Sequence, residues 1–220
     1  HPAGAWRENV LQKHYVERFA LRPADRVCMW GERQRDVFAE HLGAAPSFVV
    51  VTGSPRFDLC LPQFAWMNGD VSQTAAAHRP FILACTRFTA IAHAAGAADP
   101  FRRKLNPRIW PESMDMTRVA DLWFAKWRRD THDFADFLVL LRAVARRHAD
   151  HTIVVRPHPS ESLDFYRQAL SSLPNVVVTR EGSILGWARS AETVLHSNCT
   201  TGVEAAIAGR PVVNFRPAAD

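Results

Sequence analysis

The chain has 220 residues, 47% of them hydrophobic and 22% charged, and its 27 Lys and Arg residues against 22 Asp and Glu give a formal net charge of +5. These fractions are typical of a globular protein with a sizeable core. No apolar run of about 18 residues exists, which excludes a membrane-spanning helix. The basic clusters are short and interleaved with acids, and no nucleic-acid-binding motif is present, which argues against a nucleic-acid partner.

The modest positive charge suits an anionic ligand or the anionic inner face of a membrane, and it is equally consistent with a solvated surface that has no specific use. The four cysteines show no CxxC spacing, so neither a zinc ribbon nor a redox pair is indicated. Buried free thiols in a reducing compartment fit better. We therefore expect a cytoplasmic protein, with room for peripheral association at the inner membrane.

The first third of the chain predicts helices and strands in alternation. We expect helices over residues 10–19 and 32–42, and strands over residues 26–30 and 48–52. A polar, Ala-rich stretch at residues 68–79 carries little periodicity and is the candidate linker. The sequence thus predicts a first domain at residues 1–78 and a second at 79–220.

The second domain predicts a regular α/β order. A strand at residues 80–85 is followed by a long irregular segment at 86–111 and helices at 117–127 and 130–148. Strands at 152–156, 176–179, 193–196 and 211–215 then alternate with helices at 163–173, 184–190 and 202–208. This order predicts a doubly wound, Rossmann-like half with a parallel sheet. Because the chain starts at His1 and stops after a strand-like run, we expect a fragment that is incomplete at both ends.

Ligands of such sheets bind beyond the carboxyl ends of the strands, so the loops at those ends are the candidate sites. The loop after residues 152–156 has two prolines that restrict its histidine, which suits a group that donates a proton or balances a phosphate. A capped turn with a solvent-facing histidine is the competing interpretation. The residues assigned to donor binding here are Arg156, His158, Pro159, Ser160 and Glu161, with His158 as the catalytic residue.

The loop after residues 193–196 places small polar residues at the predicted start of a helix. Free backbone N–H groups and the helix dipole favour an anion there, hydroxyls add donors, and glycine allows close approach. A Ser/Thr cap supported from the first turn is the alternative. The candidate phosphate and ribose ligands are Ser197, Asn198, Thr200, Thr201, Gly202 and Glu204.

A third loop, after residues 48–52, holds Gly53, Arg56 and Asp58. Arg56 suits bidentate binding of a phosphate or carboxylate in a cleft. The competing interpretation is that Arg56 and Asp58 form an ion pair with each other and fix the turn.

The first and second loops, at residues 156–161 and 196–213, resemble the nucleotide-binding half of B-type glycosyltransferases, and Met29-Trp30-Gly31 and residues 51–58 also match that family's pattern. More narrowly, the chain is similar to bacterial surface-carbohydrate proteins of capsule or lipopolysaccharide biosynthesis, with motifs shared by sialyl-, Kdo- and glycerophosphotransferases. The resemblance implies two Rossmann-like halves, the first incomplete here, with residues 1–78 in the acceptor domain and 79–220 in the nucleotide-donor domain. It also implies that His158 contacts the donor phosphate or assists the leaving group, and that Ser197, Thr200 and Thr201 bind phosphate.

We therefore expect a metal-independent glycosyltransferase that uses a CMP-sugar or CDP-linked donor and a glycan or glycolipid acceptor, without a cofactor. No Asp-x-Asp motif is present to hold a metal. Where the resemblance places the family's acidic N-terminal motif, which supplies the general base, this sequence has His1-Pro2-Ala3-Gly4. A base upstream of the fragment, altered chemistry and impaired catalysis are the alternatives. A nucleotide-sugar epimerase of the same fold and a non-catalytic nucleotide-sugar binding protein remain the alternatives.

Overall fold

The computed structural model describes residues 24–36, 49–110, 112 and 114–217, which fall into two compact units. The first unit takes in the described residues up to Asp58 together with the short stretch at 110–113. In it, β1 (Val27–Met29) pairs in parallel with β2 (Val49–Val51), residues 32–36 are helical, and α3 (Pro55–Asp58) follows. Both strands were predicted from the sequence, whereas the helix expected at 10–19 lies outside the described residues.

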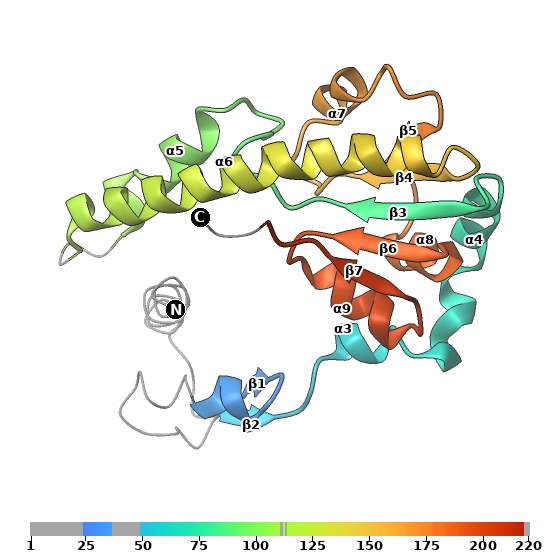
Figure 1. The fold of residues 1–220 in the computed structure, drawn as a ribbon. Helices are drawn as coiled ribbons and strands as arrows, with labels where there is room; N and C mark the ends of the chain where they lie inside the picture. Colours follow the sequence, from blue (N-terminus) through green and yellow to red (C-terminus); the bar gives the residue numbers. More distant parts are fainter. Residues whose placement is uncertain (1–23, 37–48, 111, 113, 218–220) are drawn as a thin grey trace. The chain divides into compact units, whose positions relative to one another are not determined.

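The second unit is built on a five-stranded parallel sheet in the order β5-β4-β3-β6-β7. Its strands are β3 (Phe81–Cys85), β4 (Thr152–Arg156), β5 (Val176–Val178), β6 (Thr193–His196) and β7 (Val212–Asn214). The arrows of all five point the same way in Figure 1, so their carboxyl ends share one edge of the sheet. The α/β class and the Rossmann-like parallel sheet predicted from the sequence are confirmed.

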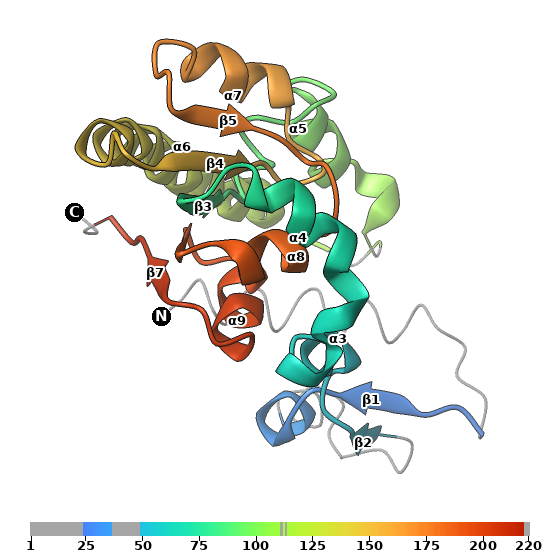
Figure 2. The same cartoon turned by 90° about the vertical axis from the view of Figure 1, so that its right-hand side faces the viewer.

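Helices cover both faces of this sheet, which explains why its strands are apolar on both sides. Along β4, Ile153 and Val155 pack with α6 (Met116–Arg147) and α7 (Leu163–Ala169), while Val154 packs on the opposite face. That opposite face carries α4 (Gly69–Ala76), α8 (Ile184–Ser190) and α9 (Thr200–Ile207), with Trp187 at its centre. The end view in Figure 2 shows the strands between these helices.

Helix α6 is a single helix of 32 residues, where the sequence predicts two helices separated near Trp127. It begins at the N-cap Asp115, whose carboxylate accepts hydrogen bonds from the N–H groups of Thr117 and Arg118. The charged residues 128–130 interrupt the apolar pattern because Asp130 is buried, beside Lys126. A buried carboxylate with a cationic partner thus occupies a position where periodicity predicts an apolar side chain.

The segment at 68–79, expected to be a linker, contains α4 and belongs to the second unit. Ala75 is fully buried beside Trp187, so this short helix covers the sheet instead of joining two domains. The structure therefore divides the chain between Asp58 and Leu59, rather than near residue 78. Small alanines give little periodic signal although they pack closely, which explains the difference.

The remaining connections are short helical turns. A 3-10 turn, η1 (Pro62–Asn68), precedes α4, and the segment at 86–111 contains α5 (Asp99–Lys104) and the 3-10 turn η2 (Pro107–Ile109). Among the described helices, none combines the length and the apolar character that a membrane crossing requires.

Candidate ligand-binding site

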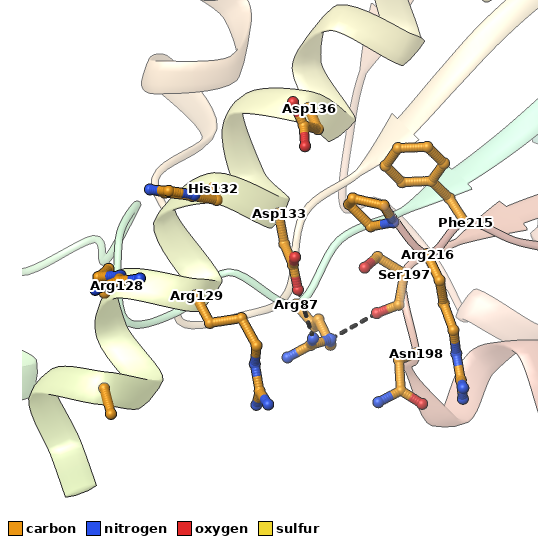
Figure 3. A pocket seen from close by; sticks show the side chains of 12 residues that line it. Arg87, Arg128, Arg129, His132, Asp133, Asp136, Ser197, Asn198, Phe215 and Arg216 are labelled. Atoms are coloured by element: carbon orange, nitrogen blue, oxygen red, sulfur yellow. Dashed lines mark hydrogen bonds and ion pairs between the residues drawn. The ribbon is translucent and has the colours of Figure 1, made fainter. Parts of the chain in front are cut away.

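A pocket of about 700 Å³ opens at the carboxyl edge of the five-stranded sheet, within the second unit. Segments that follow β3, β6 and β7 form one side of it, and the middle of α6 forms the other (Figure 3). Its volume lies in the range of small-molecule sites in proteins. It is lined by Arg87, Ala125, Arg128, Arg129, His132, Asp133, Asp136, Ser197, Asn198, Phe215, Arg216 and Pro217.

Arg87 anchors the floor of this pocket. Its Nε donates to the Ser197 carbonyl oxygen at 2.6 Å, and its terminal nitrogens lie 3.7 Å from Asp130 Oδ1 and 3.6 Å from Asp133 Oδ2 (Figure 3). The side chain is 18% exposed, so its charge faces the pocket while both carboxylates balance it. Arg87 therefore ties the loop after β6 to α6 and fixes the shape of the pocket.

Three further arginines line the pocket, together with the acidic residue Asp136. Arg128 and Arg129 lie on α6 and Arg216 follows β7; all three are exposed and, within the described part of the chain, form no ion pair. Figure 3 shows Arg129 and Arg216 on either side of Arg87 and Asn198. Planar guanidinium groups match phosphate and carboxylate oxygens well. The pocket is thus suited to an anion with more than one charge.

The loop after β6 contributes backbone as well as side chains. Asn198 adopts a left-handed conformation with φ of 50°, which asparagine tolerates better than most residues. Its N–H donates to Asn214 Oδ1 at 2.9 Å, which links the ends of β6 and β7. Of the six residues predicted in this loop and the following helix, Ser197 and Asn198 line the pocket.

The start of α9 is organised around Cys199, not around a hydroxyl cap. Cys199 is the N-cap residue and its side chain makes no capping hydrogen bond, while Thr200 and Thr201 are the first helical residues. Burial raises the pKa of the Cys199 thiol, and the N–H groups of Thr201 and Gly202 together with the Thr201 hydroxyl oppose that rise. The Thr201 hydroxyl therefore faces this sulfur in the structure, and its contact with a phosphate stays a prediction.

Gly202 makes room for a histidine ring. A Cβ placed on Gly202 would lie 2.1 Å from His196 Nε2, so only glycine fits beside this buried imidazole. His196 Nδ1 accepts a hydrogen bond from Cys199 N–H at 3.1 Å, and burial lowers the pKa of His196, with Arg216 adding to the effect. The close approach that the sequence suggested for a ligand is made by the protein's own side chain.

His158 lies at the same sheet edge but outside the residues that line the pocket. It is exposed in the loop after β4, and its Nδ1 accepts from the Ser160 N–H at 3.2 Å. Partial burial lowers the pKa of His158, and the positive charge of Arg180 lowers it further. Both effects favour the neutral form of the ring, and a neutral ring whose Nδ1 accepts from Ser160 carries its proton on Nε2. Pro159 binds through its carbonyl to Arg180 at 2.9 Å.

Three charged residues predicted to bind the donor are buried. The Arg156 guanidinium donates to the carbonyl oxygens of residues 180–182 at 2.7–3.0 Å and lies over the Trp187 ring, so it fixes the loop after β5. Glu161 is fully buried and accepts from the hydroxyls of Thr86 and Tyr166. Burial raises the pKa of Glu161. Glu204 is 3% exposed. Arg156 and Glu161 are thus bound by the protein's own groups, and donor binding by Arg156, Glu161 and Glu204 stays a prediction.

The third predicted loop belongs to the first unit. Gly53 has a positive φ of 79°, which explains the glycine, and Arg56 and Asp58 are exposed on α3. The N–H groups of Phe57 and Asp58 both donate to the Ser54 carbonyl oxygen, at 2.9 and 3.1 Å. The predicted participation of this loop in a cleft stays a prediction.

Sequence reasoning missed the arginines of the pocket. Arg87 and Arg216 directly follow β3 and β7, so the strand-end rule that singled out His158 applied to them too. Arg128 and Arg129 were noted only as a basic pair, and joining the two predicted helices into α6 would have placed them opposite the strand ends.

Comparison with known proteins adds fold information. No family model and no curated protein matches the sequence. Among solved structures, the Methanocaldococcus jannaschii UDP-GlcNAc 2-epimerase in complex with UDP-GlcNAc and UDP is similar, with a TM-score of 0.50 and 12% identity over 87% of this chain. The fold is glycosyltransferase-B-like. The match covers 45% of the epimerase, so this chain spans less than half of its length.

Proposed function

We propose that the second unit binds a nucleotide-activated sugar in the arginine-lined pocket. The observation that carries the proposal is the set of Arg128, Arg129 and Arg216 around a pocket of about 700 Å³ at the carboxyl edge of a parallel sheet. Open α/β sheets bind ligands at this edge. A nucleotide mono- or diphosphate carries the charge that these guanidinium groups are able to neutralise.

The reaction that we propose is glycosyl transfer in surface polysaccharide biosynthesis, from a CMP-sugar or another cytidine-linked donor. The bond between the donor's anomeric carbon and its phosphate oxygen breaks and a bond to an acceptor hydroxyl oxygen forms, while the hydroxyl proton passes to a general base and the phosphate leaves with the nucleotide. Arginines fixed beside the leaving phosphate stabilise the charge that develops on it, so no metal is needed for this step. We assign to His158 the role of donating a hydrogen bond from its Nε2–H to the leaving phosphate.

Sugar epimerisation is the second candidate, and the structural neighbour favours it because that enzyme was solved with UDP-GlcNAc and UDP. An epimerase keeps its nucleotide-sugar throughout and needs no acceptor. Its pocket has to hold a uridine nucleotide at least as well as a cytidine nucleotide.

The experiment that separates the two functions incubates the intact protein with labelled CMP-sugar and UDP-GlcNAc, with and without a glycan acceptor. Glycosyl transfer predicts acceptor-dependent release of nucleotide, together with slow hydrolysis of the donor alone. If an isomerised sugar appears without an acceptor, the function is epimerisation and not glycosyl transfer. Neither product, combined with tight nucleotide binding, would identify a non-catalytic binding protein.

A further inference from the structure

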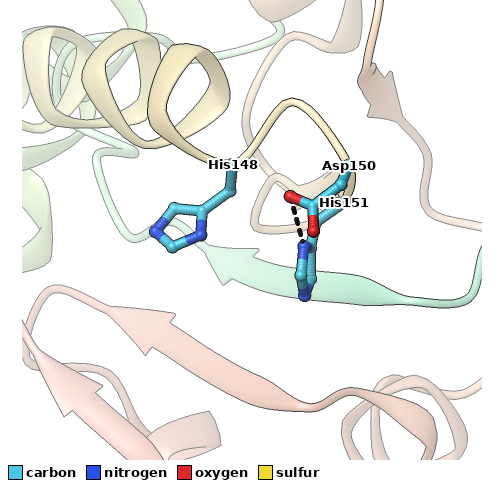
Figure 4. Close-up of side chains that lie close together, drawn as sticks. All are labelled: His148, Asp150 and His151. Carbon is cyan, nitrogen blue, oxygen red and sulfur yellow. Dashed lines mark ion pairs between the residues drawn. The ribbon is translucent and has the colours of Figure 1, made fainter.

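A second group of functional side chains lies at the other edge of the sheet, where α6 turns into β4. His148 is the C-cap of α6, and Asp150 and His151 follow in the turn before Thr152. One ligand atom from each of these three residues lies within 4.8 Å of the others. Figure 4 shows both imidazole rings projecting to the same side of the turn, with the Asp150 carboxylate beside His151.

The backbone of this turn is held in place from both sides. His148 N–H donates to the Val144 carbonyl oxygen at 2.9 Å, and His151 N–H donates to the His148 carbonyl oxygen at 3.0 Å. The Asn175 side-chain amide donates to the carbonyl oxygens of Ala145, His148 and His151 at 3.0–3.1 Å. The side chains therefore project from a preformed turn, which lowers the entropy cost of gathering them around a ligand.

The two nitrogens of His151 face different carboxylates. Nδ1 lies 3.0 Å from Asp150 Oδ1, inside the group, and Nε2 lies 2.9 Å from Glu192 Oε2, outside it. A carboxylate that accepts the N–H of one ring nitrogen leaves the other nitrogen free to bind a metal, and it orients the ring. Glu192 stands in that relation to His151 and directly precedes β6.

We propose that His148, Asp150 and His151 form a site for a divalent transition-metal ion of the zinc type, with Glu192 orienting His151. Imidazole and carboxylate are zinc ligands, and two ligands about 2.0–2.2 Å from one ion lie about 3.3–3.6 Å apart in a tetrahedron. His151 Nδ1 and Asp150 Oδ1 are 3.0 Å apart, so a small outward movement of either side chain gives this spacing. A rotation of the exposed His148 side chain brings in the third ligand, and water completes the shell.

This ion has a structural role, because the turn lies at the amino end of β4 and the pocket lies at the carboxyl edge. It ties the end of α6 to the start of β4 and, through Glu192, to the turn between α8 and β6. An ion that binds the folded chain and not the unfolded one raises the melting temperature in a concentration-dependent way. The proposal is independent of the proposed function, since it makes no use of the pocket.

The test is a calorimetric titration of Zn²⁺ into the full chain, freed of affinity tag and treated with chelator. We expect a single ion per chain and a rise in melting temperature that chelator reverses. His151→Ala should abolish both effects, and Glu192→Gln should weaken binding about tenfold, as expected for a residue that orients a metal ligand. Titration with Co²⁺ should give the visible absorption of a tetrahedral site.

His132→Ala is the matched control, because His132 is also exposed on α6 but lies outside the group. It should bind Zn²⁺ as the parent chain does. Urea unfolding of His151→Ala in the presence of chelator checks that the variant folds, and His148→Ala, altered at an exposed position, gives an independent variant. Zn²⁺ binding that survives in both histidine variants, or no binding by the parent chain, would overturn the proposal.

Discussion

Arg129 and Arg146 are both exposed on α6, but only Arg129 lines the pocket. If Arg129 binds a donor phosphate, Arg129→Gln removes a charge-assisted hydrogen bond worth about 1.5–3 kcal/mol, which weakens nucleotide binding about tenfold to a hundredfold. Unfolding by urea should be unchanged, because Arg129 forms no ion pair within the described part of the chain. The measurement is a calorimetric titration with CDP.

Arg146→Gln is the control for the same titration. It removes an equal charge from the same helix several turns away from the pocket, so nucleotide affinity should stay at the parent value. An equal loss in both variants would show that the affinity depends on overall charge and not on a defined phosphate contact.

His158 lies at the carboxyl edge but outside the pocket, so its catalytic role is a separate prediction. A charge-assisted hydrogen bond from the His158 ring to the leaving phosphate is worth about 1.5–3 kcal/mol, so His158→Ala should reduce glycosyl transfer about tenfold to a hundredfold. Its stability should change little, because the ring is exposed and makes one local hydrogen bond to the Ser160 N–H. Turnover close to that of the parent protein would leave His158 with the role of shaping the loop.

At this scale the sequence predicted two of the residues that line the pocket, but not which way each side chain points. Ser197 and Asn198 were predicted and do line the pocket. Arg156 and Glu161 were predicted from the same strand-end rule, yet they are buried and bound to neighbouring loops and hydroxyls. The direction of a side chain at a strand end depends on what packs beside it, and a single sequence does not contain that information locally.

At the scale of elements, the fit between α9 and β6 depends on Gly202. Gly202→Ala adds a Cβ where His196 Nε2 lies 2.1 Å away, so the ring or the helix has to move. Overpacking of this kind costs about 1–3 kcal/mol, which outweighs the gain of about 1 kcal/mol from replacing glycine by alanine in a helix. We expect a net loss in the free energy of unfolding, measured with urea.

Two further variants test this explanation. Gly31→Ala should be close to neutral, because no heavy atom lies within 4 Å of its added Cβ. His196→Ala removes the ring that a Cβ at residue 202 would meet. The double variant Gly202→Ala with His196→Ala should therefore be less destabilised than the sum of these two single changes. Additive effects would show that the His196 ring is not what limits residue 202.

Strands and helices differ in how far the sequence predicted them. The bounds of β4, α8 and β6 agree with the predicted ranges. For the two strands, short β-branched runs bounded by turn residues give a clear signal. Helix α6 was divided in two because Asp130 is buried with Lys126 and Arg87 as partners. Helix α4 was missed because its core contact is an alanine. Tertiary contacts, not local propensity, decided both.

At the scale of the whole molecule, the second unit has two chemically distinct edges. The carboxyl edge holds the arginine-lined pocket, and the amino edge holds the His148–His151 turn. The parallel sheet between them follows from the order of elements in the sequence, which is why the fold class was predictable from one chain. The identity of the proposed nucleotide was not, since guanidinium groups match phosphate oxygens and do not select a base.

The central claim is that the pocket binds a nucleotide donor, and the most direct test is calorimetric titration of CMP, CDP and UDP into the intact protein and into Arg129→Gln. We predict that CMP or CDP binds more tightly than UDP, and that the three nucleotides raise the melting temperature in the same order. A ligand that binds only the folded chain stabilises it by about 2.7 kcal/mol at a hundredfold excess over its dissociation constant. Arg129→Gln should weaken whichever nucleotide binds. Equal or tighter binding of UDP would contradict the cytidine donor and favour epimerisation, and the absence of binding by all three nucleotides would contradict the account itself.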